Sequence, residues 1–180
     1  LLAVPLALGC AHVSRRWGHM RAFRTTPFGS LFQAYGEAVL DATPPGGALL
    51  VSTTDLTWNS VRYLRECEGR RLDDVAHVNL QVVPFPWFER QHGLPDYANV
   101  TFPPLRSDVS MEKGSAGRVR FVSDFLHANL GSGRFPGGVY LDIHAVLETA
   151  LVGPNLYRDS GLQLLPHGPL WRAVLPAAAK

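Results

Sequence analysis

Charge and cysteine are both scarce in this sequence. Charged residues make up 18% of the 180 residues and hydrophobic residues 46%, a balance that excludes an intrinsically disordered chain and allows one compact domain. The net charge of +2 is too small to favour nucleic-acid binding, which needs a concentrated basic face. Two cysteines, Cys10 and Cys67, are too few for a disulfide scaffold or a zinc site. We expect two unpaired small hydrophobic residues, with a single bridge between them as the alternative.

Three motifs that mark common enzymes are also missing. The sequence contains no GxGxxG, no GxxxxGK(S/T) and no GxSxG, so a dinucleotide site, a P-loop and a serine-hydrolase elbow have no support. Asp142 and His144 are expected on one face of a strand, a spacing that some metal sites use. No third ligand lies near them in sequence, and we therefore expect neither a metal nor a cofactor.

The chain opens with an apolar run. Residues 1–10 carry no charge, and a basic segment that includes Trp17 follows from His12 to Arg24. The run is too short to cross a bilayer by itself, and it lacks the charged leader of a signal peptide. It fits the end of a transmembrane helix whose water interface is formed by Trp17 and the arginines, with an apolar helix of the domain itself as the alternative. We accordingly expect a membrane-proximal segment over 1–28, an α/β domain over 29–176 and a tail over 177–180.

Hydrophobic spacing predicts an α/β fold for the domain. The expected elements of its first half are a helix over 30–41, a strand over 48–53, a helix over 55–68 and a strand over 77–83. Thr54 or Asp55 caps the second helix, which places Val61, Leu64 and Cys67 on its inner side. A strand, helix, strand succession is a right-handed crossover unit, so we predict a small, mainly parallel sheet with flanking helices.

The second half of the sequence is less regular. Residues 84–117 are rich in proline, glycine and aromatic residues, which predicts a long irregular excursion with one helical turn near Trp87–Gln91. A helix is expected over 118–130 and a strand over 138–146. The two halves of 162–175, separated by Pro166–Pro169, are expected to form closing strands with a turn between them.

Asp55 is the best placed candidate for ligand binding. It follows the first expected strand at its carboxyl end, where open α/β sheets bind their ligands. An aspartate at the start of a helix also acts as a cap that accepts backbone N–H groups, and this is the alternative role.

Asn99 begins the one complete N-glycosylation sequon, Asn99-Val100-Thr101. It lies in the irregular excursion, where a surface loop is expected. The motif is a glycosylation site only in a secretory compartment.

Several segments, taken in order, resemble the region after the last membrane span in the transmembrane protein 260 family. The segments are 47–88, 99–104, 118–130, 138–146 and 162–176, and the resemblance covers about 30–176. The family pattern is a strand with an Asp-containing turn, a helix ending in Tyr-Leu and Cys-Glu-Gly, and a strand leading to a Trp-Phe pair. In this sequence these are Asp55, Tyr63–Leu64, Cys67–Gly69 and Trp87–Phe88.

The resemblance implies the lumenal part of an endoplasmic-reticulum membrane O-mannosyltransferase. Such enzymes take mannose from dolichyl phosphate mannose and place it on Ser or Thr of protein acceptors. Their catalytic acidic residue is expected in a lumenal loop of the membrane part, so no catalytic residue is transferred to this chain. The implied partners are the protein's own transmembrane core, the protein acceptor, dolichyl phosphate mannose and the membrane, and nucleic acid is not among them.

Two features of the sequence disagree about the compartment. The arginines after residues 1–10 favour the cytosol by the positive-inside rule. That rule compares loops, however, and this sequence contains only one. Asn99 and the family resemblance both favour the lumen, and we expect the domain to face the lumen of the endoplasmic reticulum.

Four aromatic residues and Asp55 form the expected contact surface. Trp58, Tyr63, Trp87 and Phe88 are candidates for stacking on an acceptor or a sugar, and a place in the core is the alternative for each. Two other functions remain open. One is a non-catalytic α/β binding or scaffold domain of a membrane protein, and the other is a soluble enzyme that uses Asp55.

Overall fold

The computed structural model describes residues 21, 27–105, 110–112, 115–152 and 160–176. The expected membrane-proximal segment lies mostly outside these residues, as do Cys10 and the tail 177–180. Among the described residues, no helix is both long and apolar enough to cross a membrane.

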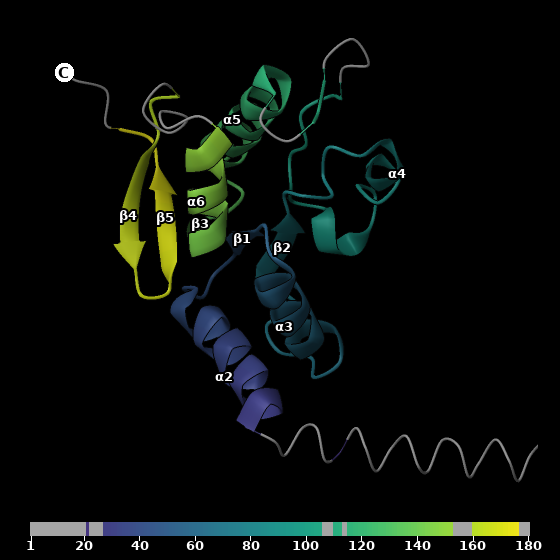
Figure 1. The fold of residues 1–180 in the computed structure, drawn as a ribbon, viewed down its shortest axis with the longest axis vertical. Coiled ribbons are helices and arrows are strands. Elements are labelled where there is room, and N and C mark those ends of the chain that lie inside the picture. The colour runs from purple at the N-terminus through teal and green to yellow at the C-terminus, as the bar shows by residue number, and fades with distance from the viewer. Residues whose placement is uncertain (1–20, 22–26, 106–109, 113–114, 153–159, 177–180) are drawn as a thin grey trace, which may run out of the picture.

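The fold is α/β, built on one mixed sheet of five strands (Figure 1). The strands, in spatial order, are β2 (Val75–Asn79), β1 (Ala48–Ser52), β3 (Gly138–Asp142), β5 (Leu170–Val174) and β4 (Gln163–His167). The first three are parallel, and the β4–β5 hairpin is antiparallel to β3. The expected parallel core is therefore confirmed, and the hairpin extends it at one edge.

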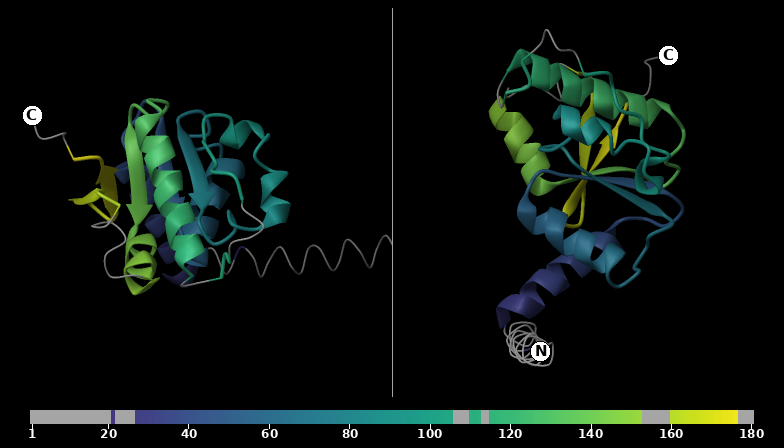
Figure 2. Two further views of the ribbon diagram at one scale, coloured as in Figure 1. Left: turned by 90° about the horizontal axis from the view of Figure 1, so that it is seen from above. Right: turned by 90° about the vertical axis from the view of Figure 1, so that its right-hand side faces the viewer.

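Helices cover both faces of the sheet (Figure 2). On one face lie α2 (Pro27–Ala42) and α3 (Asp55–Glu66), and on the other lies α5 (Ala116–Gly131). Strand β1 is buried on both sides because its alternating side chains enter two cores. Leu49 packs in the core that contains Phe125 of α5, and Leu50 packs in the core that contains Leu64 of α3.

Helix α3 starts as the sequence predicts and ends differently. Thr54 is the N-cap, and its hydroxyl accepts the backbone N–H of Thr57 at 3.5 Å. Val61 and Leu64 are fully buried. The placement of Cys67 on the inner side is wrong, because Cys67 is the C-cap beyond the last turn and its thiol is free and exposed.

The excursion after β2 is held together by aromatic rings. It contains two short helices, α4 (Pro86–Glu89) and η1 (Pro95–Tyr97). The rings of Phe88, Tyr97 and Phe102 contact one another, and Phe102 contacts Phe125 of α5, with centroids 5.5 to 5.9 Å apart. The ring of His92 stacks on Phe102 at 3.7 Å. This cluster gives a proline-rich segment a fixed shape.

Two strand predictions are corrected by the structure. Strand β2 lies earlier than the predicted 77–83, because Asn79 turns the chain: its side chain accepts the backbone N–H of Gln81 at 2.9 Å. The strand predicted over 138–146 ends at Asp142. Helix α6 (Ile143–Val152) follows directly, and the Asp142 carboxylate caps it by accepting the N–H of Ala145 at 2.5 Å.

Arg71 joins the end of α2 to the start of β2. Its guanidinium donates to the carbonyl oxygens of Leu40, Thr43 and Pro44, and it pairs with Asp74 at 2.7 Å. A positive charge at the carboxyl end of a helix is favourable because the last carbonyl groups lack partners within the helix.

Candidate functional site

The carboxyl ends of β1 and β3 lie at a point where the chain reverses its direction across the sheet. From β1 the chain passes through α3 to β2 on one side, and then through α5 to β3 on the other side of β1. The two connecting helices cover opposite faces (Figure 2). Ligands of open α/β sheets bind at such a switch point, because the connections leave the strand ends in opposite directions.

Polar side chains gather at this switch point. Thr53, Thr54 and Asp55 follow β1, and Asp142 is the last residue of β3. The two strands are neighbours, with Val51 opposite Leu141. Asp55, the sequence-predicted candidate, is exposed in the first turn of α3, and the capping side chain is that of Thr54. Asp55 is thus accessible to a ligand.

Asp142 is the residue that sequence reasoning missed in this role. It is fully buried, and one carboxylate oxygen, Oδ1, caps α6. Its second oxygen, Oδ2, and the hydroxyl of the buried Thr53 have no hydrogen-bond partner among the described residues. Burial raises the pKa of Asp142, while the hydrogen bond from the N–H of Ala145 acts to lower it.

Hydroxyl groups connect this site to α2. The hydroxyl of Thr57 lies 3.0 Å from that of Tyr35 in α2 and 3.4 Å from that of Thr54. Within this set Asp55 is exposed and Thr54 is partly exposed, and their oxygen atoms match the hydroxyl groups of a neutral polar ligand. Two carboxylates beside the amino ends of α3 and α6 disfavour an anion.

A buried Ser–His pair lies beside this site. The hydroxyl of Ser52 is 3.0 Å from Nε2 of His77, and both residues are buried. Burial, together with the nearby Arg65 and Arg62, holds the pKa of His77 well below its usual value, so the ring is neutral. The face of Trp58 tilts over His77 at 4.7 Å. The pair is part of the packing and is not accessible to a substrate.

The expected strand arrangement of Asp142 and His144 is wrong. Since β3 ends at Asp142, His144 lies in the first turn of α6 and is exposed, whereas Asp142 is buried. Among the described residues, no group of three or more His, Cys, Asp and Glu side chains is placed to hold a metal ion.

The four aromatic candidates have different environments. Phe88 is 3% exposed and belongs to the core. Trp58 is half-buried between His77 and Arg62, whose guanidinium carbon lies 5.4 Å from its ring centre. Tyr63 is 42% exposed at the surface of α3, and Trp87 is 52% exposed on α4. Trp58 and Trp87 lie on different helices and share no ring contact, since the ring contacts of Trp87 are with Phe85 and Phe88.

Phe85 is an aromatic surface residue that the sequence did not single out. It is 49% exposed and stacks on Trp87, with ring centroids 6.2 Å apart and planes 16° from parallel. The T-shaped contact of Trp87 with the buried Phe88 fixes the pair to the core. We refer to Phe85 and Trp87 as the aromatic pair. Two adjacent exposed large aromatics form a contact surface with little side-chain entropy left to lose.

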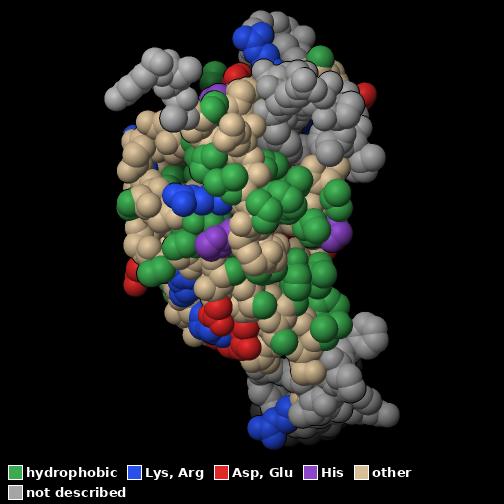
Figure 3. Space-filling model, turned by 90° about the vertical axis from the view of Figure 1, so that its left-hand side faces the viewer, with side chains coloured by type: hydrophobic (Ala, Val, Ile, Leu, Met, Phe, Trp, Pro, Cys, Tyr) green, Lys and Arg blue, Asp and Glu red, His purple; other side chains and the backbone are tan. Residues whose placement is uncertain are grey.

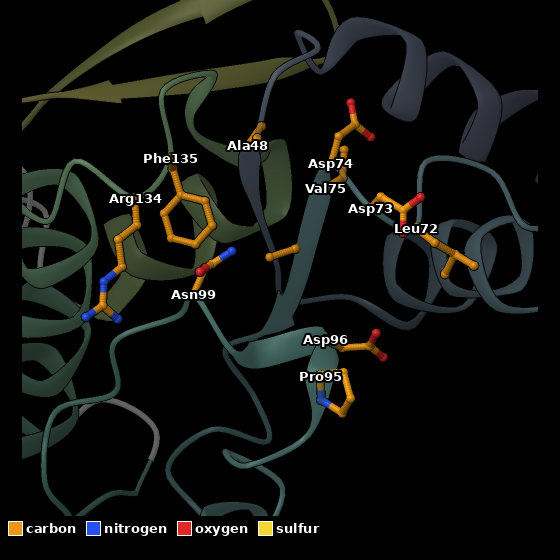
Figure 4. Close-up of a pocket in the computed structure, with 12 residues that line it drawn as sticks. Ala48, Leu72, Asp73, Asp74, Val75, Pro95, Asp96, Asn99, Arg134 and Phe135 are labelled. Atoms are coloured by element: carbon orange, nitrogen blue, oxygen red, sulfur yellow. The ribbon is translucent and has the colours of Figure 1, made fainter.

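Asn99 lines a cavity at the opposite end of the strands from the switch point (Figure 4). The cavity has a volume of about 440 Å³ and lies beside the amino ends of β1 and β2. Its walls come from the loop before β2, from the excursion and from the loop before β3. Asn99 itself is exposed, so its side chain is accessible for modification.

Apolar side chains are also exposed on the side of the β4–β5 hairpin (Figure 3). Among the described side chains of β4 and α6, the large exposed apolar ones are Leu165, Ile143 and Leu147, which are 46 to 52% exposed.

Comparison with protein-family models, with curated proteins and with solved structures finds no match to this chain.

Proposed function

We propose that this chain is the lumenal accessory domain of an endoplasmic-reticulum membrane O-mannosyltransferase. In this proposal the domain holds the protein acceptor, and the membrane part of the same protein transfers mannose from dolichyl phosphate mannose to its Ser or Thr. The resemblance of residues 30–176 to the region after the last membrane span of the transmembrane protein 260 family supports this assignment.

The observation that carries the proposal is the aromatic pair. Phe85 and Trp87 are about half exposed, although a stacked Phe–Trp pair is costly to leave in water and is more often found in a core. Their position next to Phe88, which contacts Trp87 and packs against Tyr97, suits a surface that receives a protein or a glycan.

The transfer chemistry belongs to the membrane part in this proposal. Moving a sugar from a lipid phosphate to a hydroxyl needs a base for the hydroxyl proton and stabilisation of the leaving phosphate. A domain that binds the acceptor contributes by positioning it near those groups. The exposed apolar side chains of Ile143 and Leu147 in α6 give this domain a surface that fits contact with the protein's own membrane core.

A second candidate function is favoured by the switch point. The exposed carboxylate of Asp55 supports a non-catalytic α/β domain that binds a hydroxyl-bearing ligand at the carboxyl ends of β1 and β3. Binding of such a ligand to a Trp87→Ala variant, with the switch point intact, would be unchanged under this alternative.

The experiment that tests the proposal measures mannose transfer by the full-length protein that contains this chain. Trp87→Ala and Phe85→Ala remove the two rings, and Leu165→Ala is the matched control, because Leu165 is equally exposed but lies on the hairpin. Loss of a ring at a binding surface costs about 1 kcal/mol or more, which corresponds to at least about a fivefold rise in KM for the acceptor protein. The turnover number is expected to stay unchanged.

Either of two results would contradict the proposal. One is an unchanged KM in both aromatic variants, and the other is mannose transfer by residues 1–180 alone, which would place the catalytic centre in this chain.

A further inference from the structure

The cavity beside Asn99 has the lining of a carbohydrate site. Two exposed carboxylates, Asp73 and Asp96, offer acceptors for sugar hydroxyl groups, and the guanidinium of Arg134 offers donors. Phe135 supplies an apolar face against which the C–H face of a sugar ring packs. The volume of about 440 Å³ lies within the usual range of small-molecule sites.

Asn99 lies beside Phe135 in this lining. Figure 4 shows its side chain between the Phe135 ring on one side and the segment of Asp96 on the other. The amide is therefore directed to the space that the apolar and polar walls enclose.

The position of the sequon is fixed from both sides. Val100 is 7% exposed, and its N–H donates to the carbonyl of Tyr97 at 2.9 Å. The buried Asn129 of α5 makes two bonds to the backbone of Thr101: its Oδ1 accepts the N–H at 2.9 Å and its Nδ2 donates to the carbonyl at 2.8 Å. A group attached to Asn99 would accordingly have a defined starting point and direction.

We propose that the first sugar of an Asn99-linked glycan occupies this cavity. The chain then provides both the attachment point and the binding site, and the N-acetylglucosamine ring packs on Phe135, which lies next to Asn99 in Figure 4. The glycan ties together three segments that are far apart in the sequence: the loop before β2, the excursion and the loop before β3.

The modification itself balances as a glycosyl transfer. A lipid diphosphate-linked oligosaccharide is the donor, and an oligosaccharyltransferase is the catalyst. The Nδ2 atom of Asn99 forms a bond to C1 of the sugar and loses a proton. The bond between C1 and the phosphate oxygen breaks, and the lipid diphosphate leaves with the electron pair. This inference rests on the lumenal placement in the proposed function.

The test uses the full-length protein produced in a eukaryotic cell, in three forms. One carries the intact glycan, one is trimmed to a single N-acetylglucosamine by an endoglycosidase, and one is the Asn99→Gln variant. Hydrogen exchange is measured by mass spectrometry in residues 72–76, 95–99 and 134–135. We expect slow exchange in the first two forms and several-fold faster exchange in Asn99→Gln, because one sugar ring is enough to fill the contact.

Phe135→Ala supplies the specific control. This variant keeps the sequon and is expected to carry the glycan, yet complete removal of the glycan should no longer change the exchange of the three segments. Leu165→Ala, on the β4–β5 hairpin, should show the same glycan-dependent exchange as the wild-type sequence.

The inference is overturned by the absence of a glycan at Asn99. It is also overturned if exchange is the same with one sugar and with none, or if Phe135→Ala leaves the glycan-dependent protection intact. The acceptor KM of Trp87→Ala reports on the proposed function separately, since the aromatic pair does not line this cavity.

Discussion

Asparagine at position 142 separates the two roles of the buried Asp142 carboxylate. The side chain caps α6 through Oδ1, and its charge is buried with Oδ2 unpartnered among the described residues. Asparagine caps a helix about as well as aspartate but carries no charge. Asp142→Asn should therefore keep the cap and remove only the cost of burying a carboxylate.

The sign of the pH dependence follows from the direction of the pKa shift. Burial raises the pKa of Asp142 in the folded state, so the folded state binds the proton more tightly than the unfolded state does. Below the ordinary value of 3.8 both states are protonated and the carboxyl costs nothing. As the pH rises through the raised pKa, the folded wild type loses stability, and Asp142→Asn does not. The free energy of unfolding of the variant, minus that of the wild type, should increase from acid to neutral pH.

The contribution of the Asp142 cap to the free energy of unfolding can be measured separately from that of the charge. Replacing a capping side chain by alanine costs about 1 kcal/mol, within a range of about 0.5 to 2 kcal/mol. Asp142→Ala should be less stable than Asp142→Asn by about that amount at acid and at neutral pH alike, because both variants lack the charge. The difference between these two variants therefore measures the cap alone.

Urea unfolding at a series of pH values, followed by the fluorescence of the four tryptophans, provides the assay. Parallel pH profiles of the wild type and Asp142→Asn would refute the reasoning about the buried charge. Equal stability of the asparagine and alanine variants would refute the capping role.

Three further substitutions, at Arg71 and Gly36, test the packing that positions the site. Arg71→Ala should lower the free energy of unfolding by about 2 kcal/mol or more, since it removes charged hydrogen bonds to the end of α2. Arg71→Gly should lose about 1 kcal/mol less, because φ at this residue is 56° and glycine adopts that conformation without strain; equal losses would contradict this. Gly36→Ala should destabilise the protein by about 1 to 3 kcal/mol, although alanine is the better helix former, because its Cβ would lie 2.9 Å from Leu64 Cδ1. Calorimetric melting checks Gly36→Ala, and a raised melting temperature would count against the close packing of α2 on α3.

The elements with strong local signals could be predicted from the sequence. Helices α2, α3 and α5 have a hydrophobic period, and α3 has a capping residue before it, Thr54. The β4–β5 hairpin has its turn at Gly168 and Pro169. Each of these signals is local in sequence, which is why none needed knowledge of the tertiary structure.

There is a physical reason why helix α6 could not be predicted. The run from Gly138 to Val146 is apolar with few interruptions, and such a run fits a buried strand and a buried helix equally well. The change of conformation occurs at Asp142, whose carboxylate ends the strand and caps the helix at once. The same change of conformation buries Asp142 and exposes His144. The wrong prediction of a strand beyond Asp142 was therefore also the reason for the wrong prediction that Asp142 and His144 share one face.

Which aromatic residues of the excursion are buried depends on contacts that have no period in the sequence. Phe85, Trp87 and Phe88 lie within four consecutive positions, yet only Phe88 enters the core. Its ring is selected by Tyr97 and Phe102, which come from later parts of the excursion, and by their contact with α5. Because Phe88 is fixed in this way, the preceding turn of α4 must direct Trp87 outward, where it stacks on Phe85. The exposed pair is thus a consequence of the buried cluster, and a substitution that loosens Phe88 would disturb the surface as well as the core.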